Sequence, residues 1–332
     1  MDFSRSPTLP LPADLRAALD ALAAKADNPE VSAAARDLSA AYRERRNSAA
    51  AIRAAAHVLA YLTTRLPATF AAVESALTRL CAASPGFAPR SVLDLGCGPG
   101  TASWAATAVF NDIDSVTMVD ANPGLLDAAR QLAGAATDPA LQEATISRSD
   151  LLSPPAGSYD LVLLSYALTE LPDHRLAAAI EAAWSRCAGA MLIVEPGTPR
   201  DYARLAGLRT QLLAAGAAVA APCPHQVPCP LVAPDWCHFS VRLARSRQHV
   251  QLKGGTLGYE DEKFSYLAVV RPDLQLMRGT ARVLARPAES KFDVRLKLCQ
   301  ADGTVEERQV LRRDKHAHRR VRRLDWGDAL DP

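Results

Sequence analysis

Three cysteines lie within fifteen residues of the sequence, with the spacing C-x5-C-x7-C. Four prolines interrupt the first nine positions of the segment PCPHQVPCP (222–230), so neither a regular helix nor a central strand runs through it. Proline also fixes φ and lowers the entropy that a loop loses when it is ordered. Thiolates gathered in a stiff loop are suited to soft metal centres. The pattern predicts a metal site that uses Cys223, Cys229 and Cys237.

A single metal site usually needs four ligands, so these three cysteines need a partner. The candidates are His225, His238 and a distant cysteine, of which Cys299 stands out because it ends the strand-like run VRLKLC. Four thiolates would suit an iron–sulfur cluster, whereas a mixture of cysteine and histidine would suit zinc. The sequence lacks the C-x2-C pairs of a zinc ribbon. The remaining alternative is a surface loop with unreactive cysteines.

A second group of residues forms the stretch VLDLGCGPGTAS (92–103), in which a strand-like run enters a glycine-rich turn and then a helix. Glycines let the backbone approach a ligand where a Cβ atom would clash. The helix that follows presents free N–H groups to an acceptor on the ligand. These features predict a nucleotide-cofactor site at the three glycines Gly96, Gly98 and Gly100.

The aspartates near the glycine turn indicate which cofactor would bind there. Asp120 ends the next strand about twenty residues further on, where a carboxylate can accept hydrogen bonds from ribose hydroxyls. The spacing G-x-G-x-G after Asp94 differs from that of dinucleotide binders and resembles motif I of class I S-adenosylmethionine-dependent methyltransferases. By that resemblance Asp120 would bind the ribose and Asp150 would lie near the adenine amine. A nicotinamide cofactor and a site that has lost its ligand are the alternatives.

Methyl transfer is a separate question from cofactor binding. The stretches LLSYALTELP and IVEPG lack the N/D-P-P-Y/F signature with which some methyltransferases hold a flipped base. Glu170 and Glu195 are candidates for a polar role at the carboxyl end of the sheet, or they cap helices and face solvent. The sequence therefore predicts cofactor binding and leaves catalysis open.

Three regions must position these groups. Residues 1–88 are rich in Ala, Leu and Arg at helical spacing and predict a helical region. Residues 89–220 alternate strand-like and helical segments, which favours a doubly wound parallel sheet. The resemblance to motif I implies that this region is an S-adenosylmethionine-binding domain. Residues 221–332 begin with the cysteine–proline segment and continue as short antiparallel strands, some of which would complete the main sheet. We therefore expect an α/β, class I methyltransferase-like (Rossmann-type) fold with a helical amino-terminal region and a β-rich, cysteine-containing extension.

The composition favours a globular protein, since 49% of the 332 residues are hydrophobic and 22% are charged. No apolar run approaches the ~20 residues that a membrane span needs. The first residues, MDFSRSPTLPLP, lack the basic region and apolar core of a signal peptide and are a poor transit peptide. These features predict a cytoplasmic protein without a membrane partner.

The segment LRRDKHAHRRVRR (311–323) contains seven lysines and arginines and one aspartate. Such a cluster could neutralise phosphates and release their counterions, in which case RNA binding would weaken as salt is added. By itself, however, the segment is more typical of a solvated charged face. The residues concerned are Arg312, Arg313, Lys315, Arg319, Arg320, Arg322 and Arg323.

The stretches PCPHQVPC, DWCHFS, YEDEKFSYLAV and WGD together resemble the methyltransferase-like family of small-ribosomal-subunit assembly factors. Its mitochondrial members include methyltransferase-like protein seventeen and a yeast mitoribosomal small-subunit protein, of which this chain would be a bacterial relative. The resemblance runs from about residue 40 to residue 330.

This resemblance implies a [4Fe–4S] cluster held by Cys223, Cys229, Cys237 and Cys299, and contact with ribosomal proteins and small-subunit rRNA but not with DNA. Contact of the basic segment with rRNA then becomes the favoured interpretation. The predicted function is assembly of the small ribosomal subunit. An active S-adenosylmethionine-dependent rRNA methyltransferase is the first alternative. A zinc-containing methyltransferase that acts on a small molecule or protein is the second.

Overall fold

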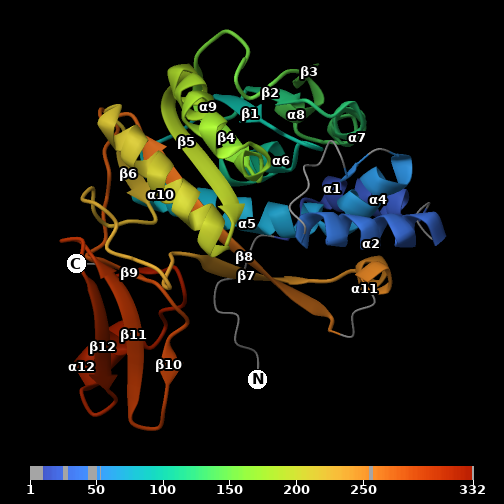
Figure 1. The fold of residues 1–332 in the computed structure, drawn as a ribbon. Coiled ribbons are helices and arrows are strands. Elements are labelled where there is room, and N and C mark those ends of the chain that lie inside the picture. Colours follow the sequence, from blue (N-terminus) through green and yellow to red (C-terminus); the bar gives the residue numbers. More distant parts are fainter. Residues whose placement is uncertain (1–9, 25–28, 44–50, 53, 254–256, 331–332) are drawn as a thin grey trace.

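The computed structural model describes residues 10–24, 29–43, 51–52, 54–253 and 257–330 of the chain. Two β-sheets organise these residues. An eight-stranded sheet runs through the main body, and a five-stranded sheet near the carboxyl end of the chain projects away from it (Figure 1).

The amino-terminal region is helical, as predicted, and its helices are α1 (Ala13–Ala23), α2 (Pro29–Arg43), α4 (Ala55–Thr64) and α5 (Leu66–Ala83). Most side chains of α5 are buried, because small and apolar residues occupy nearly all of its faces. This helix packs against strands of the main sheet and forms part of the core. No helix among the described residues has both the length and the apolar character needed to cross a membrane.

The main sheet has the strand order β3-β2-β1-β4-β5-β8-β6, with β7 paired to β8. The first five strands of this path are parallel, whereas β8 runs antiparallel between β5 and β6. The strands are β1 (Ser91–Leu95), β2 (Ser115–Asp120), β3 (Thr145–Arg148), β4 (Tyr159–Ser165), β5 (Cys187–Pro196), β6 (Ala218–Ala221), β7 (Phe239–Ala244) and β8 (Tyr259–Val270).

Helices cover both faces of the main sheet, which explains why its central strands are continuously apolar. On one face lie α5, α6 (Thr101–Val109), α7 (Pro123–Ala133) and α8 (Pro139–Gln142). On the other face lie α9 (Asp173–Arg186) and α10 (Pro199–Ala214), and the 3-10 turn η1 (Leu168–Glu170) joins the same core. Because both faces are covered, the loops at the carboxyl ends of the parallel strands are where a ligand would have access to the sheet.

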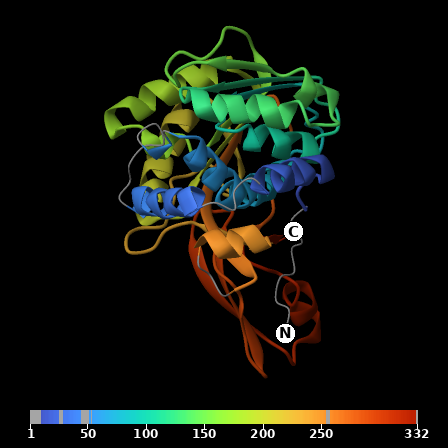
Figure 2. The ribbon, with the colours of Figure 1, turned by 90° about the vertical axis from the view of Figure 1, so that its right-hand side faces the viewer.

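The paired strands β7 and β8 extend beyond the edge of the main body, and the connection between them contains α11 (Arg247–Lys253). Helix α11 packs against α2 and α4, as Figure 2 shows from the side. Leu252 of α11 joins a small apolar cluster that contains Leu38 of α2 and Ala60 of α4. The hairpin therefore ties the amino-terminal helices to the sheet.

The second sheet has the order β10-β11-β9-β13, with β12 paired to β11. It contains β9 (Ala281–Val283), β10 (Ala288–Glu289), β11 (Asp293–Gln300), β12 (Val305–Leu311) and β13 (Ala329–Leu330), and α12 (Lys315–Val321) packs on β12. A separate apolar core, which includes Val283, Leu298 and Val321, holds this sheet and helix together.

The predicted fold class is confirmed: a doubly wound, methyltransferase-like sheet carries a helical amino-terminal region and a β-rich extension with cysteines. The extension contributes to both sheets, since β7 and β8 belong to the main one. Two short helices after residue 241, α11 and α12, were not expected. Long-range packing of Leu252 stabilises α11, and an Asp314 side chain that accepts a hydrogen bond from the Ala317 N–H caps α12.

Candidate functional site

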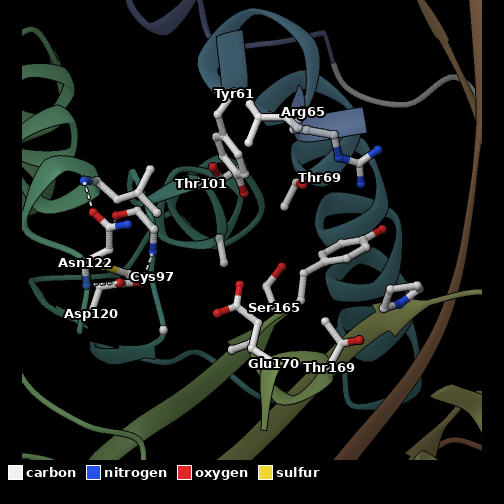
Figure 3. Close-up of a pocket in the computed structure, with 18 of the residues that line it drawn as sticks. Tyr61, Arg65, Thr69, Cys97, Thr101, Asp120, Asn122, Ser165, Thr169 and Glu170 are labelled. Carbon is white, nitrogen blue, oxygen red and sulfur yellow. Dashed lines mark hydrogen bonds between the residues drawn. The ribbon is translucent and has the colours of Figure 1, made fainter. Parts of the chain in front are cut away.

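A large cavity of about 1060 Å³ lies at the carboxyl ends of β1, β2 and β4. This is the side of a doubly wound sheet on which ligands usually bind. Its walls come from the glycine turn, from the loops after β2 and β4, and from the amino-terminal helices. Figure 3 shows side chains that face the open space from several sides, among them Tyr61, Thr101, Asp120, Ser165 and Glu170.

The glycine turn after β1 has the conformation that its sequence predicts. Gly96, Gly98 and Gly100 have φ values of +70°, +54° and +82°, in the left-handed region that side chains disfavour. A Cβ atom on Gly96 would also lie 2.6 Å from the Cβ atom of Ala167. Helix α6 then starts at Thr101, whose buried hydroxyl lines the cavity and has no hydrogen-bond partner among the described residues. The turn thus exposes backbone and one free hydroxyl to the cavity.

Asp120 holds the glycine turn and faces the cavity. Its Oδ2 atom accepts a hydrogen bond from the Gly98 N–H at 2.8 Å, and its Oδ1 atom accepts one from the Asn122 N–H at 2.7 Å. Burial raises the pKa of this carboxyl above its usual range, although the two backbone bonds oppose the rise. Each oxygen keeps a further lone pair with which to accept a ligand hydroxyl.

The other predicted cofactor residues have different positions. Asp150 lines the cavity, where Oδ1 accepts a hydrogen bond from the Leu152 N–H and Oδ2 lies 3.6 Å from Arg175. Asp94 is fully buried behind the turn and accepts hydrogen bonds from the backbone and hydroxyl of Ser103. Burial raises the pKa of Asp94 to about 7. Neither Asp94 nor Gly100 is among the cavity-lining residues, so both support the turn from behind.

A partly buried ion pair closes one side of the cavity. Arg65, between α4 and α5, donates from both terminal nitrogens to the carboxylate of Glu262 on β8, at 3.0 and 3.2 Å. The hydroxyl of Tyr166 donates to the same carboxylate at 2.9 Å. Tyr166 follows β4 with a φ of 56°, which is unusual for a residue with a side chain. Sequence analysis missed this network because its members are far apart in the chain.

The four predicted metal ligands line one second cavity. Cys223, Cys229 and Cys237 come from the segment between β6 and β7, and Cys299 comes from β11 of the second sheet. The Sγ atom of Cys229 lies 3.1 Å from the hydroxyl of Tyr202 on α10. The structure thus brings together cysteines from two parts of the chain.

The two histidines near these cysteines differ in position. His225 is buried, with Nδ1 3.0 Å from the Val227 carbonyl and Nε2 3.3 Å from the Sγ atom of Cys299. His238 stacks on Trp236 with ring centroids 4.6 Å apart and is not among the residues that line the cavity. Neither imidazole lines the cavity, although that of His225 lies beside Cys299.

The cysteine cavity has the residue types of a thiolate-bound metal site. However, no three His, Cys, Asp or Glu side chains in the described part of the chain are spaced as metal ligands. Burial raises the pKa of the Cys299 thiol to about 12 and that of Cys237 well above its usual range, so binding would require a metal to displace the protons. Two buried polar groups from cavity-lining residues, Tyr266 Oη and Arg209 Nε, lack hydrogen-bond partners among the described residues. The sulfur donors and these polar atoms suit a polar, thiolate-bound occupant.

The basic segment lies on the second sheet, away from both cavities. Its seven predicted RNA-binding residues are all exposed, in the turn after β12, in α12 and in the residues that follow: Arg312, Arg313, Lys315, Arg319, Arg320, Arg322 and Arg323. Arg312 lies 3.2 Å from Glu289. Of the aromatic residues in YEDEKFSYL, Phe264 and Tyr266 are buried in the core and only Tyr259 is exposed.

Comparison with known proteins identifies the family. The model of the family "Mitochondrial small ribosomal subunit Rsm22" matches residues 55–331, which include the cysteine cavity, most of the lining of the large cavity and the basic segment. The chain belongs to the Rsm22 family. The family resemblance predicted from the cysteine–proline and EDEKFSYL stretches is thereby confirmed.

Two curated Rsm22-like relatives are similar over most of this chain. The human ribosome assembly protein METTL17, mitochondrial, is 27% identical over an alignment of 288 positions that covers 82% of this chain and 62% of the relative. The mitochondrial Rsm22-cox11 tandem protein 2 of Schizosaccharomyces pombe is 26% identical over 322 residues, with coverage of 82% and 42%. The chain thus spans less than two thirds of the length of either relative. Its predicted cytoplasmic location is wrong by this comparison, since the family and both relatives are described as mitochondrial.

A solved structure is also similar in fold. Magnesium protoporphyrin IX methyltransferase from Synechocystis PCC 6803, with bound S-adenosylmethionine, matches with a TM-score of 0.42 and 17% identity. The match covers 65% of this chain and 83% of that structure.

Glu195, at the carboxyl end of β5, is a buried acid beside the large cavity. Its Oε1 atom accepts a hydrogen bond from the Leu168 N–H at 3.0 Å, and its Oε2 atom has no partner among the described residues. Burial, and then the nearby charge of Asp201, raise the pKa of Glu195 to about 8. The side chain is therefore protonated at neutral pH.

The substitution Glu195→Gln should flatten the pH dependence of stability. The folded chain holds this proton up to a pH of about 8, whereas the unfolded chain releases it near the ordinary value of 4.5. The free energy of unfolding should therefore fall as the pH rises between these values, and the fall should be smaller in the variant, whose amide oxygen still accepts from Leu168. Urea unfolding at several pH values measures this. Glu181→Gln, at an exposed position on α9, is the control, and identical profiles for E195Q and wild type would contradict the assignment.

Proposed function

We propose that this protein is a maturation factor of the small ribosomal subunit that binds S-adenosylmethionine and folds its RNA-binding extension around a [4Fe–4S] cluster. The observation that carries this proposal is the cavity lined by four cysteines from two separate parts of the chain. Membership of the Rsm22 family and the name of the relative METTL17, a ribosome assembly protein, support the ribosomal role.

The cluster would be held by Cys223, Cys229, Cys237 and Cys299. Four sulfur donors around one cavity are the ligand set of an iron–sulfur cluster, and a bound cluster would supply a rigid multivalent cross-link between its ligands. Here that link would join the loop after β6 to strand β11. Because binding energy at such a site becomes folding energy, the cross-link would fix the second sheet on the main body.

The second sheet also carries the basic segment. A cross-link at Cys299 would therefore fix the position of that segment relative to the main body. Strand β11 pairs with β12 over seven residue pairs, and the basic segment begins where β12 ends. The position of Cys299 therefore determines where the exposed arginines lie. A basic surface on a fixed support suits the phosphates of folded rRNA.

The large cavity would hold S-adenosylmethionine. The left-handed glycine turn lets the backbone approach the ligand, and the carboxylate of Asp120 would accept hydrogen bonds from the ribose hydroxyls. Asp150 would lie near the adenine, and the free Thr101 hydroxyl at the start of α6 would meet a polar group of the methionine part.

Methyl transfer to rRNA is a second candidate function, and the extent of the cavity favours it. The lining continues past the glycine turn to Thr198 and Arg200, beyond the carboxyl end of β5. This leaves room for an acceptor beside the cofactor. S-adenosylmethionine would then be a methyl donor rather than only a structural ligand.

The substitution Asp120→Asn should weaken S-adenosylmethionine binding by about ten- to a hundredfold, because hydrogen bonds to a charged group contribute about 1.5–3 kcal/mol. Isothermal titration calorimetry measures the affinity, with Asp127→Asn, at an exposed position on α7, as the control. Unchanged affinity in D120N would contradict the assignment of the large cavity to S-adenosylmethionine.

Loss of an rRNA methyl group in a deletion strain, restored only when Asp120 is intact, would favour the enzyme over the purely structural role.

The substitution Cys299→Ser should abolish or strongly reduce iron binding. Wild-type protein purified without oxygen should contain about four irons and four sulfides per chain and absorb broadly in the visible range. Metal and sulfide analysis measures both, and Cys187→Ser, which changes a buried cysteine in another core cluster, should keep the iron. A colourless, iron-free wild-type protein that folds fully and binds immature subunits would refute the cluster, and zinc alone would favour the zinc alternative.

Replacement of Arg319, Arg320 and Arg323 by glutamine should weaken rRNA binding and reduce its salt dependence. Each lost phosphate contact should lower the slope of log affinity against log salt by about 0.7–0.9. Filter binding to small-subunit rRNA between low and physiological salt measures this slope. Arg90→Gln and Arg130→Gln, exposed arginines of the main body, are controls. An unchanged slope in the triple variant would place the RNA contact elsewhere.

A further inference from the structure

Two buried arginines line the cysteine cavity. Arg209 comes from α10 in the main body and is 5% exposed, whereas Arg282 comes from β9 in the second sheet and is 8% exposed. Both side chains line the same cavity as Cys223, Cys229, Cys237 and Cys299.

The hydrogen bonds of these arginines go to neutral carbonyl groups. Arg209 donates to the carbonyls of His225 and Val227 at 3.1 and 2.9 Å. Arg282 donates to the carbonyls of Pro222 and Gly327, each at 2.8 Å. Within the described residues neither guanidinium lies within ion-pair distance of a carboxylate, in contrast to Arg65 with Glu262. The charge of Arg282 does act on Asp328 at longer range, where it opposes the rise in the pKa of that carboxyl.

Such an arrangement favours an anion in the cavity. Arginine stays protonated even when buried, and a buried charge without a counter-charge is strongly unfavourable. Carbonyl oxygens satisfy some N–H groups but do not neutralise the charge. The Nε atom of Arg209 has no partner among the described residues, which leaves a donor available for an occupant.

We propose that Arg209 and Arg282 supply the counter-charge of the metal centre and thereby determine its retention and its reduction potential. This inference rests on the cluster of the proposed function. Four thiolates around an oxidised [4Fe–4S] core leave roughly two negative charges, which two guanidinium groups would balance. One-electron reduction adds a further negative charge, so nearby cations favour the reduced form.

The origin of the two arginines adds a structural condition. Arg209 holds the loop at His225 and Val227, whereas Arg282 holds it at the residue before Cys223. One cation therefore belongs to each part of the molecule that the cluster would join. The charge balance is complete only when the second sheet is docked on the main body.

The test compares full-length Arg209→Met and Arg282→Met with Arg209→Lys and Arg282→Lys, all purified or reconstituted without oxygen. Iron and sulfide content, the rate of iron loss to a chelator, and a redox titration followed by electron paramagnetic resonance are measured. The methionine variants should lose iron several-fold faster and have a more negative midpoint potential than wild type. The lysine variants, which keep the charge, should lie closer to wild type.

Arg271→Met is the matched control. Its side chain also donates to two backbone carbonyls, those of Cys187 and Trp184, each at 2.8 Å, but it does not line the cysteine cavity. This variant should keep the wild-type potential and iron retention. The control thus separates loss of a carbonyl-binding arginine from loss of charge beside the cluster.

The results for the methionine and lysine variants either support or overturn the role of the two arginines. Wild-type potential and retention in both methionine variants would overturn it. If the methionine variants hold no cluster, a lysine variant that retains iron supports the role of charge, whereas equal loss in both series shows that the arginines only brace the loop. Iron-free wild-type protein would overturn the proposed function and this inference together. Iron-loaded wild type with unaltered methionine variants would overturn the inference alone.

Discussion

The antiparallel strand β8 is the constraint on which the rest of the structure depends. It pairs with β5, β6 and β7, so its register fixes the edge of the main sheet. Because side chains alternate along a strand, Glu262, Phe264 and Tyr266 share one face. Glu262 closes the large cavity and Tyr266 lines the cysteine cavity, with Phe264 buried between them. A single extended segment therefore sets the distance between the two candidate sites.

The cysteine segment depends on the same strand. The segment leaves β6 and enters β7, both of which pair with β8, and the hydroxyl of Ser265 on β8 donates to the carbonyl of Cys237 at 2.8 Å. The main sheet thus positions three cysteines, while the second sheet contributes the fourth. Arg282 and Lys297 add contacts from the second sheet, to Pro222 and Asp235 respectively. The site lies at the joint between the two sheets.

Local patterns predicted the parts of the molecule that neighbouring residues determine. The glycine turn followed from its spacing, because positive φ values require glycine. The approach of Cys299 to the loop was anticipated from its place at the end of a strand. The ion pair of Arg65 with Glu262 and the cations at the cysteines were not, because those residues meet only through tertiary packing. The helix α12 was not predicted because most of its residues are charged or polar and only Ala317 and Val321 contact the apolar core.

The placement of Cys299 on β11 has a consequence for the order in which the site can form. A nascent chain emerges from its amino end, so the loop with Cys223 and Cys237 is made well before β11. The side of the cavity that carries Cys299 is absent until β11 has left the exit tunnel and paired with its neighbouring strands. A chain truncated before β11 would therefore present three thiols to the cell without the means to enclose them.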